Sequence, residues 1–284
     1  MRLVPTRPSL TPYIGVNHSL ARLGPAAASL RGMPELPEAE RARQQIERVL
    51  GREIVAVDDR DTYVCRPHPP GEIAAALTGH RLTRAHRRGK FLWVETDDGP
   101  DLGLHLGMAG RIAVDEEEAP RRWDRFALEF AHGGRMALRD KRRLGRAVIE
   151  PDFSHVGPDA AEVGRDVFRD RVGRGSTALK ARLLDQGVIA GVGNLLADET
   201  LWRAKLSPRR VAGELSVEEL DVLRRELRAA VRDAIRNGGV HTGRFMPARG
   251  RGGACPRCRT PLERDTIGGR TTYWCPRCQP SEAR

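Results

Sequence analysis

The sequence predicts a multidomain α+β protein, with an N-terminal β-sandwich that has a leading helix, then a helical domain and a C-terminal cysteine module. Three observations support this fold class. Short alternating apolar segments, typical of strands, follow a single helical pattern in the first half of the chain. Helical periodicity replaces them after residue 158, and two Cys-x-x-Cys pairs lie near the end. The 284 residues are enough for several domains and a sizeable core.

Residues 1–32 differ in composition from the rest of the chain. They contain four arginines, four prolines and no acidic residue, and they show little periodicity. We therefore expect this segment to be disordered. It could be a targeting peptide, which is typically basic and poor in acids, or upstream sequence read through from a wrongly assigned start.

The elements of the first domain can be assigned in order. Residues 38–50 are predicted to form an amphipathic helix, because apolar residues recur at helical spacing, Pro37 suits a first turn and Gly51 suits the end. Strands are expected at residues 54–57, 91–94, 102–106 and 111–114, followed by a hairpin that turns at residues 132–134. Together these elements predict a β-sandwich domain over residues 33–150.

The next domain, residues 158–240, is predicted to be helical. Helices are expected near residues 177–186, 194–204 and 216–236, and the last of them has an apolar stripe. The glycine turn GVGN, residues 191–194, lies between the first two. Amides exposed at such a turn and at a helix start can bind an anion. Asn194 could cap the helix or bond a phosphate, and its spacing alone favours capping.

The C-terminal module, residues 249–280, has the spacing of a metal site. Its two Cys-x-x-Cys pairs are separated by sixteen residues and comprise Cys255, Cys258, Cys275 and Cys278. That pattern predicts a four-cysteine zinc ribbon, in which one Zn²⁺ is structural because four thiolates leave no open coordination position. A hairpin is expected over residues 262–273 with its tip at 268–269. Arg270 beside the tip could meet a phosphate or could be an ordinary surface arginine.

Composition narrows the class of partner and the compartment. The formal net charge is +11 and the isoelectric point is about 10.3, which favours a polyanion such as nucleic acid over a merely basic soluble protein. No apolar run approaches the 18 residues of a membrane span. Cysteines spaced for a metal indicate a reducing compartment, so we expect a cytoplasmic protein.

Some polar and apolar residues have ordinary interpretations when judged alone. Lys90 follows a basic pair, and such a lysine is usually a solvated charge. His105 lies in an apolar strand, where a core histidine is the default. Met108 would normally be core, and Cys65 is expected to be buried filler.

Several fragments together resemble one family. MPELPEAE, RRGKFLW, HLGMAGR, DKRRLG, LLDQGVIAGVGNLLADE and the cysteine module occur in the order found in formamidopyrimidine-DNA glycosylase and endonuclease VIII. The resemblance covers residues 33–279. It implies a β-sandwich, a helix–two-turn–helix domain and a zinc ribbon, in a monomer of the bacterial type, associated with the nucleoid. It also implies base excision repair of damaged double-stranded DNA, in which an oxidised base is excised and the abasic strand is nicked.

The resemblance also implies roles for single residues. Pro34 matches the nucleophile, Glu35 its acid/base partner, and Lys90 a catalytic position near the scissile phosphate. The implied DNA-binding residues are His105, Met108, Arg142, Leu144, Lys180, Asn194 and Arg270. Among these, Met108 and Leu144 are expected to fill the gap left by an extruded base, and Arg142 to bond the orphaned partner base.

Pro34 can act only if its nitrogen is free. An internal proline nitrogen is an amide whose lone pair is delocalised, whereas an N-terminal proline is a secondary amine that can form a Schiff base. We therefore expect the active enzyme to lack residues 1–32 and Met33. If the extension is retained, Lys90 is the alternative nucleophile, or the protein is a DNA-binding module without catalysis.

Two departures from the family pattern bear on the substrate. Leu144 stands where the 8-oxoguanine enzymes usually have phenylalanine. Only fifteen residues separate Gly239 from Cys255, so the loop that caps the flipped base in those enzymes is expected to be missing. These departures favour oxidised pyrimidines and abasic sites. The alternative is an 8-oxoguanine and formamidopyrimidine glycosylase.

Overall fold

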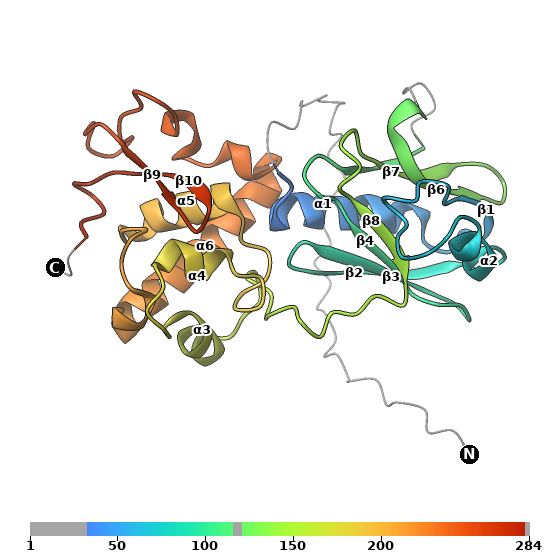
Figure 1. Cartoon of the computed structure of the whole chain (residues 1–284), viewed down its shortest axis with the longest axis horizontal. Helices are drawn as coiled ribbons and strands as arrows, with labels where there is room; N and C mark the ends of the chain where they lie inside the picture. The colour runs from blue at the N-terminus through green and yellow to red at the C-terminus, as the bar shows by residue number, and fades with distance from the viewer. Residues whose placement is uncertain (1–32, 116–120, 282–284) are drawn as a thin grey trace, which may run out of the picture. The chain divides into compact units, whose positions relative to one another are not determined.

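The computed structural model describes residues 33–115 and 121–281 (Figure 1). The prediction that residues 1–32 are disordered therefore concerns a segment outside the described residues. Within the described part, the predicted fold class is confirmed: a leading helix and two four-stranded sheets are followed by a helical region and a C-terminal hairpin with a four-cysteine cluster.

The leading helix α1 spans Leu36–Ile46 and continues as a 3₁₀ turn over Glu47–Val49. It begins two residues earlier than predicted, with Pro37 in its first turn. The Glu38 carboxylate accepts a hydrogen bond from the backbone N–H of Glu35 at 3.0 Å, which satisfies one of the free donors at the helix start. This bond fixes the backbone of the segment that carries Pro34 and Glu35.

The sandwich consists of two antiparallel sheets. One has the order β1 (Ile54–Asp58), β6 (Asp124–Phe130), β7 (Arg135–Arg139) and β5 (Arg111–Val114), and the other β2 (Leu82–Arg88), β3 (Phe91–Thr96), β4 (Leu102–His105) and β8 (Arg146–Ile149). Apolar side chains of both sheets and of α1 form one core, which includes Leu92, Phe126 and Met136. Short helix α2 (Glu72–Leu77) packs on β1 and β8. Cys65 is buried in the same core, as expected.

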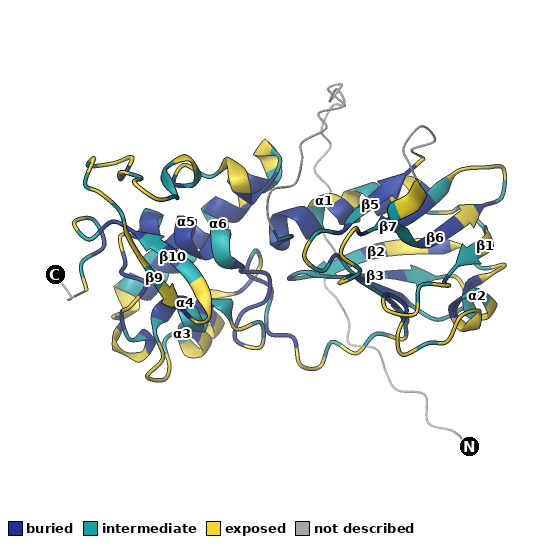
Figure 2. Cartoon of the chain, turned by 45° about the horizontal axis from the view of Figure 1, so that its top comes forward, coloured by how far each residue is buried: buried dark blue, intermediate teal, exposed yellow. Residues whose placement is uncertain are grey.

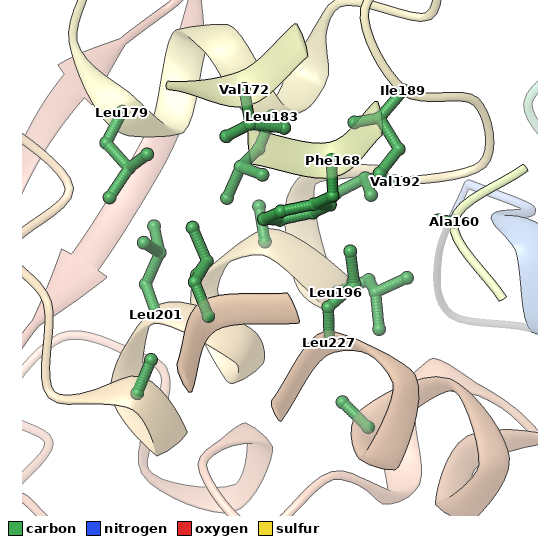
Figure 3. Close-up of a cluster of buried hydrophobic side chains, with 14 of the residues drawn as sticks. Ala160, Phe168, Val172, Leu179, Leu183, Ile189, Val192, Leu196, Leu201 and Leu227 are labelled. Carbon is green, nitrogen blue, oxygen red and sulfur yellow. The ribbon is translucent and has the colours of Figure 1, made fainter. Parts of the chain in front are cut away.

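The helical region contains α3 (Arg165–Val172), α4 (Leu179–Leu184), α5 (Asn194–Ala204) and α6 (Val217–Asn237). Its apolar core is built around Phe168, Leu196 and Leu227 (Figure 3). Leu36, from the first residue of α1, is fully buried in this helical core. No helix of the described residues is both long and apolar enough to cross a membrane.

The C-terminal hairpin pairs β9 (Glu263–Ile267) with β10 (Arg270–Trp274). Gly268 and Gly269 form its tip, as predicted, and both have positive φ, which suits a tight two-residue turn. Along β10, buried Thr272 and Trp274 alternate with half-buried residues, and Arg270 at the start of the strand is exposed (Figure 2). The connection from α6 contains only two 3₁₀ turns, Val240–Thr242 and Met246–Ala248.

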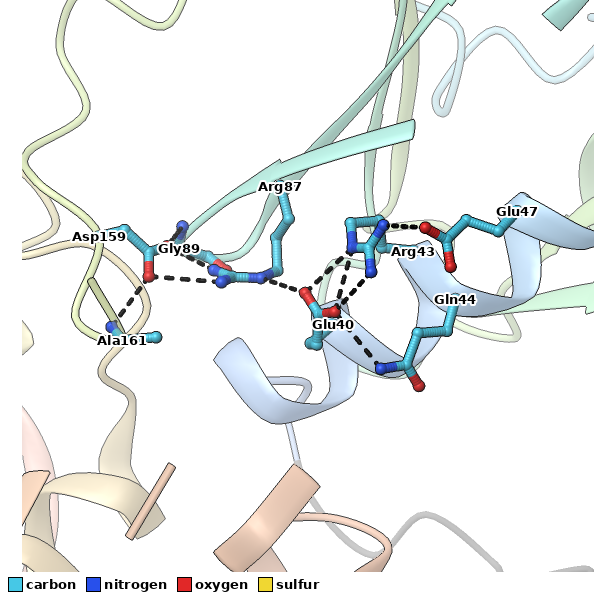
Figure 4. A network of polar contacts seen from close by, with 8 residues as sticks. All are labelled: Glu40, Arg43, Gln44, Glu47, Arg87, Gly89, Asp159 and Ala161. Carbon is cyan, nitrogen blue, oxygen red and sulfur yellow. Dashed lines mark hydrogen bonds and ion pairs between the residues drawn. The ribbon is translucent and has the colours of Figure 1, made fainter. Parts of the chain in front are cut away.

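A buried charge network fastens the β2–β3 turn to the segment that leads into the helical region (Figure 4). The guanidinium of Arg87 pairs with Glu40 of α1 at 2.9 Å and with Asp159. Asp159 also accepts hydrogen bonds from the backbone N–H groups of Gly89, at 2.6 Å, and Ala161, at 2.9 Å. The turn carrying residue 90 is thereby held against the start of the helical region.

Candidate active site

Pro34 and Glu35 lie in the buried segment that enters α1. Only 1% of Glu35 is exposed. Its carboxylate accepts three hydrogen bonds from backbone N–H groups at the start of α5: from Gly193 at 3.1 Å, Leu195 at 2.8 Å and Leu196 at 2.9 Å. The anion site predicted at the glycine turn therefore exists, and the group it holds is the protein's own carboxyl.

Glycine allows the two segments to approach this closely. A Cβ on Gly193 would lie 2.3 Å from the carboxyl carbon of Glu35, although its backbone is extended and would suit any residue. Gly191 has φ +107°, and a Cβ there would lie 2.5 Å from a methyl carbon of Leu36. The backbone N–H of Leu36 donates to the carbonyl of Gly191 at 3.0 Å. The glycines are thus required for contact with residues 35–36.

Burial sets the protonation of Glu35. It raises the pKa of this carboxyl to about 7, against the opposing effects of the Lys90 charge and of the amides of Leu195 and Leu196. Burial also lowers the pKa of Lys90; the nearby charge of Arg270 acts in the same direction and that of Glu35 opposes it. Near neutral pH the site therefore holds a carboxyl that can both give and take a proton, and a partly desolvated amine close enough for its charge to act on that carboxyl.

His105 is a neutral imidazole at neutral pH. Burial, followed by the charge of Lys90, lowers its pKa to about 4. Its Nδ1 accepts a hydrogen bond from the backbone N–H of Gly107 at 3.1 Å. In the neutral ring the proton is then on Nε2, which leaves that nitrogen as a donor for an acceptor such as a phosphate oxygen.

Met108 and Leu144 lie on adjoining loops and are exposed, at 37% and 41%. A Cβ on Gly107 would lie 2.4 Å from the carbonyl carbon of Leu144, so the two loops are in close contact. The core assignment of Met108 is therefore wrong, and its projection agrees with the position implied by the family resemblance. Two exposed apolar side chains on adjoining loops are a feature of sites that bind another molecule.

Asp140 organises the second of these loops. Its carboxylate is fully buried and accepts hydrogen bonds from the backbone N–H groups of Arg142 at 2.8 Å, Leu144 at 2.7 Å and Gly145 at 2.7 Å. Arg143, between them, has φ +57°, an uncommon value for a residue with a side chain. The loop is thus preorganised, and it presents Arg142 on the surface.

Lys180 is expected from the family resemblance to contact DNA, but in the structure its side chain lies in the interior of the protein. Its ammonium is fully buried, pairs with Asp198 at 2.7 Å and donates to the Thr272 hydroxyl at 2.8 Å. Burial lowers its pKa, against the effect of Asp198. Asp198 also pairs with Arg249 at 2.7 Å. Lys180 therefore fastens α4 and α5 to the hairpin, and it presents no charge to the surface.

Asn194 is the first residue of α5, and the N-cap position before it is occupied by Gly193. The Asn194 side chain therefore does not cap the helix. Its amide nitrogen instead donates to the Thr271 carbonyl at 3.1 Å. The same carbonyl accepts from Arg249 at 2.9 Å. The capping role favoured by spacing is therefore wrong. Arg270, next to this carbonyl, is exposed and close enough to Lys90 to influence its pKa.

The four cysteines of the C-terminal module lie together. Their sulfur atoms are all within 4.8 Å of one another. Tetrahedral Zn²⁺ with bonds of about 2.3 Å places its sulfurs about 3.8 Å apart, so the cluster fits one ion. The indole N–H of Trp202 in α5 donates to Cys255 at 3.4 Å, which links the cluster to the helix that holds Glu35. All four coordination positions are filled by thiolates, so the metal is structural.

Three domain families match successive parts of the chain. They are the formamidopyrimidine-DNA glycosylase N-terminal domain over residues 33–147, the H2TH domain of the same enzymes over 156–245, and a zinc finger found in FPG and IleRS over 252–280. The chain belongs to the formamidopyrimidine-DNA glycosylase family. Members of this family are DNA glycosylases with AP lyase activity in base excision repair, and this chain is one of them.

Curated relatives and solved structures agree with this. The chain is 37% identical to the formamidopyrimidine-DNA glycosylase of a Nocardioides strain (89% of this chain, 96% of the relative) and 36% identical to that of Thioalkalivibrio sulfidiphilus (87% and 100%). Its structure resembles MutM in complex with DNA that contains carbocyclic 8-oxo-G, with a TM-score of 0.76 and 28% identity (87% and 100%). It also resembles the Lactococcus lactis enzyme with DNA that contains an oxidised pyrimidine, with a TM-score of 0.77 and 27% identity (87% and 100%).

Sequence reasoning missed the supporting residues of this glycosylase. Asp140 and Asp159 hold the loops that carry Arg142 and Lys90, and nothing in their local sequence distinguishes them from surface aspartates. The sequence predicts a turn at Gly193, but the closeness of Gly193 to Glu35 depends on a contact across 158 positions of sequence.

Proposed function

We propose that this glycosylase excises oxidised purines of the 8-oxoguanine and formamidopyrimidine type through a Schiff base on Pro34. The observation that carries the proposal is the buried carboxyl of Glu35, adjacent in sequence to Pro34 and titrating near neutral pH. General acid–base catalysis is most effective when the pKa of the group lies near the working pH. The names of the curated relatives support this choice of lesion.

The proposed reaction uses a free amine at Pro34. The amine attacks C1′ of the damaged nucleotide, the glycosidic bond breaks, and Glu35 gives its proton to the ring oxygen or to the departing base. The sugar ring opens to an iminium ion. Loss of a proton from C2′ then allows the 3′ C–O bond to break, which nicks the strand, and hydrolysis of the imine frees Pro34.

The free amine requires removal of residues 1–33. The family match begins at residue 33, and the Thioalkalivibrio relative is covered over its whole length by 87% of this chain. We propose that the active form begins at Pro34. Its α-amino group would have a pKa of about 8, so a useful fraction is neutral at physiological pH.

Borohydride trapping on abasic DNA tests this mechanism. We compare the 284-residue chain, a chain that begins at Pro34, and the Pro34→Gly and Lys90→Ala variants of the shorter chain. The chain that begins at Pro34 is expected to trap, and the longer chain is not. If the longer chain, with its α-amino group chemically blocked, traps as much DNA as the chain that begins at Pro34, the nucleophile is a residue other than Pro34. Because Pro34→Gly keeps an α-amino group that can itself be trapped, Lys90 is identified as that nucleophile only if the longer chain traps and Lys90→Ala in that chain abolishes its trapping.

DNA contacts follow from the surface placement of the predicted residues. We propose that Met108 and Leu144 fill the gap in the stack, that Arg142 bonds the orphaned base, and that Lys90 and Arg270 bind phosphates. Inserted apolar side chains offset the few kcal/mol that base extrusion costs. A module that only binds DNA would show the same contacts without a nick, so strand cleavage separates the two.

Oxidised pyrimidines remain a second candidate substrate. The connection from Val240 to Ala254 is short, and its only regular elements are two 3₁₀ turns. A Lactococcus lactis relative has been solved with oxidised-pyrimidine DNA. Single-turnover excision from duplexes with 8-oxoguanine, 5-hydroxycytosine or thymine glycol decides between them. Faster release of 8-oxoguanine supports the proposal, and at least about tenfold faster release of the pyrimidines would replace it.

A further inference from the structure

Tyr63 is an exposed aromatic residue beside the loop that carries Arg142 and Leu144. It lies in the segment between β1 and α2, and 56% of it is exposed. This segment runs along β8: the Tyr63 carbonyl accepts a hydrogen bond from the Arg146 guanidinium at 3.1 Å, and the Val64 carbonyl accepts from the backbone N–H of Ala147 at 3.0 Å. Tyr63 is therefore fixed next to the strand that follows Leu144.

The ring of Tyr63 is oriented by a cation. The guanidinium carbon of Arg143 lies 4.5 Å from the centre of the ring. Two nitrogens of the same guanidinium bind the carboxylate of Asp61 at 2.9 and 3.0 Å, and Asp61 is almost fully buried. A planar guanidinium held by a carboxylate on its edge presents its face for stacking, so Asp61 and Arg143 together fix the ring.

Exposed Tyr63 lies beside the loop of Leu144 and so extends the apolar surface formed by Met108 and Leu144. The backbone of Leu144 contacts Gly107, in the loop that carries Met108. The residue before Leu144 is Arg143, whose guanidinium stacks on Tyr63. Arg143 lies over the ring, Arg146 bonds the Tyr63 carbonyl, and Arg142 is exposed in the same loop. An aromatic ring among arginines suits a base or a deoxyribose, because every base offers a face for stacking and the phosphates attract the cations.

We propose that Tyr63 is a further DNA-contacting residue, which stacks on a nucleotide bordering the gap that Met108 and Leu144 fill. The proposal rests on the proposed function, since that function places DNA on this surface. It extends the contact beyond the residues implied by the family resemblance. The ring supplies contact area at low entropic cost, because it is already held by Arg143.

Binding of a duplex with an uncleavable abasic analogue tests the proposal on the whole chain that begins at Pro34. Tyr63→Ala is expected to raise Kd about tenfold, the equivalent of about 1.4 kcal/mol, which is within the range for loss of one stacked base. Tyr63→Phe keeps the ring and is expected to stay within about twofold of the wild type. Val55→Ala, at a comparably exposed apolar residue on β1, is the matched control and should change Kd less than twofold.

Further measurements give each outcome a definite meaning. Fluorescence of 2-aminopurine opposite the abasic analogue reports opening of the stack, and it should fall in Tyr63→Ala alone. A Tyr63→Ala chain that binds within about twofold of the wild type, or a Tyr63→Phe chain as weak as Tyr63→Ala, overturns the proposal. Borohydride trapping by the wild type is scored separately: its absence would refute the proposed function, whereas the binding comparison still decides the role of Tyr63.

Discussion

At the scale of single residues, Glu35 shows two opposing effects on one carboxyl. Three backbone N–H donors at the start of α5 favour its charged form, as does the positive end of the helix dipole. Burial outweighs them and raises the pKa to about 7. The carboxyl contributes stability that is fully present below about pH 4.5, the ordinary pKa, and that is lost as the pH rises through about 7.

The same titration predicts a pH profile for base excision. Glu35 must hold its proton, so its active fraction falls above pH 7, while the amine of Pro34 must lose its proton, with a pKa of about 8. The single-turnover rate should rise up to about pH 7, stay level to about pH 8 and fall at higher pH. Glu35→Gln should lower the rate by about 10²- to 10⁴-fold and abolish the fall.

Exposed Glu47 provides the control for this measurement. Glu47→Gln should leave both the rate and the shape of the profile as in the wild type, because its carboxyl only forms a surface ion pair with Arg43 at the end of α1. A fall above pH 8 that persists in Glu35→Gln would assign the acid group to another residue.

At the scale of elements, Asp159 is the residue that holds the β2–β3 turn and with it Lys90. Asp159→Ala removes one partner of the buried Arg87 and leaves the N–H of Gly89 without an acceptor. The free energy of unfolding should fall by about 2–4 kcal/mol, as measured by urea denaturation. Excision should slow even at saturating DNA, because the Lys90 amine loses its fixed position.

Two variants check the origin of this effect. Asp159→Asn keeps an acceptor for Gly89 and should lose less stability than Asp159→Ala. Asp166→Ala, at an almost fully exposed position in α3, should change the free energy of unfolding by less than about 0.5 kcal/mol. Equal loss in Asp159→Ala and Asp166→Ala would contradict the positioning role.

Local patterns explain which elements could be predicted. A glycine turn followed by helical periodicity predicts helix α5 at residues 194–204, and paired glycines predict the hairpin tip at 268–269. The strands β2 and β8 and the helices α2 and α3 were missed because they are short or rich in arginine, which obscures the apolar period. The burial of Lys180 depends on Asp198 and Thr272, which are remote in sequence, so no local signal could reveal it.

At the scale of the whole molecule, the zinc module supports the DNA-binding surface through α5. Removing Zn²⁺ with a chelator should unfold residues 252–280 and free Arg270, raising Kd for abasic-analogue DNA about tenfold or more. Trp202 and Trp274, buried next to the cysteines, should shift their fluorescence to the red. Zn²⁺ should restore binding and Mg²⁺ should not, because Mg²⁺ prefers oxygen ligands.

The bond between Glu35 and the amides of α5 means that neither half of the molecule contains a complete active site. The carboxyl comes from the segment before the sandwich, and its donors come from beyond residues 151–158, the linker that joins the sandwich to the helical region. A protease cut in that linker should leave activity intact while the halves stay associated. Dilution should then abolish it, with a concentration dependence that reports the affinity of one half for the other.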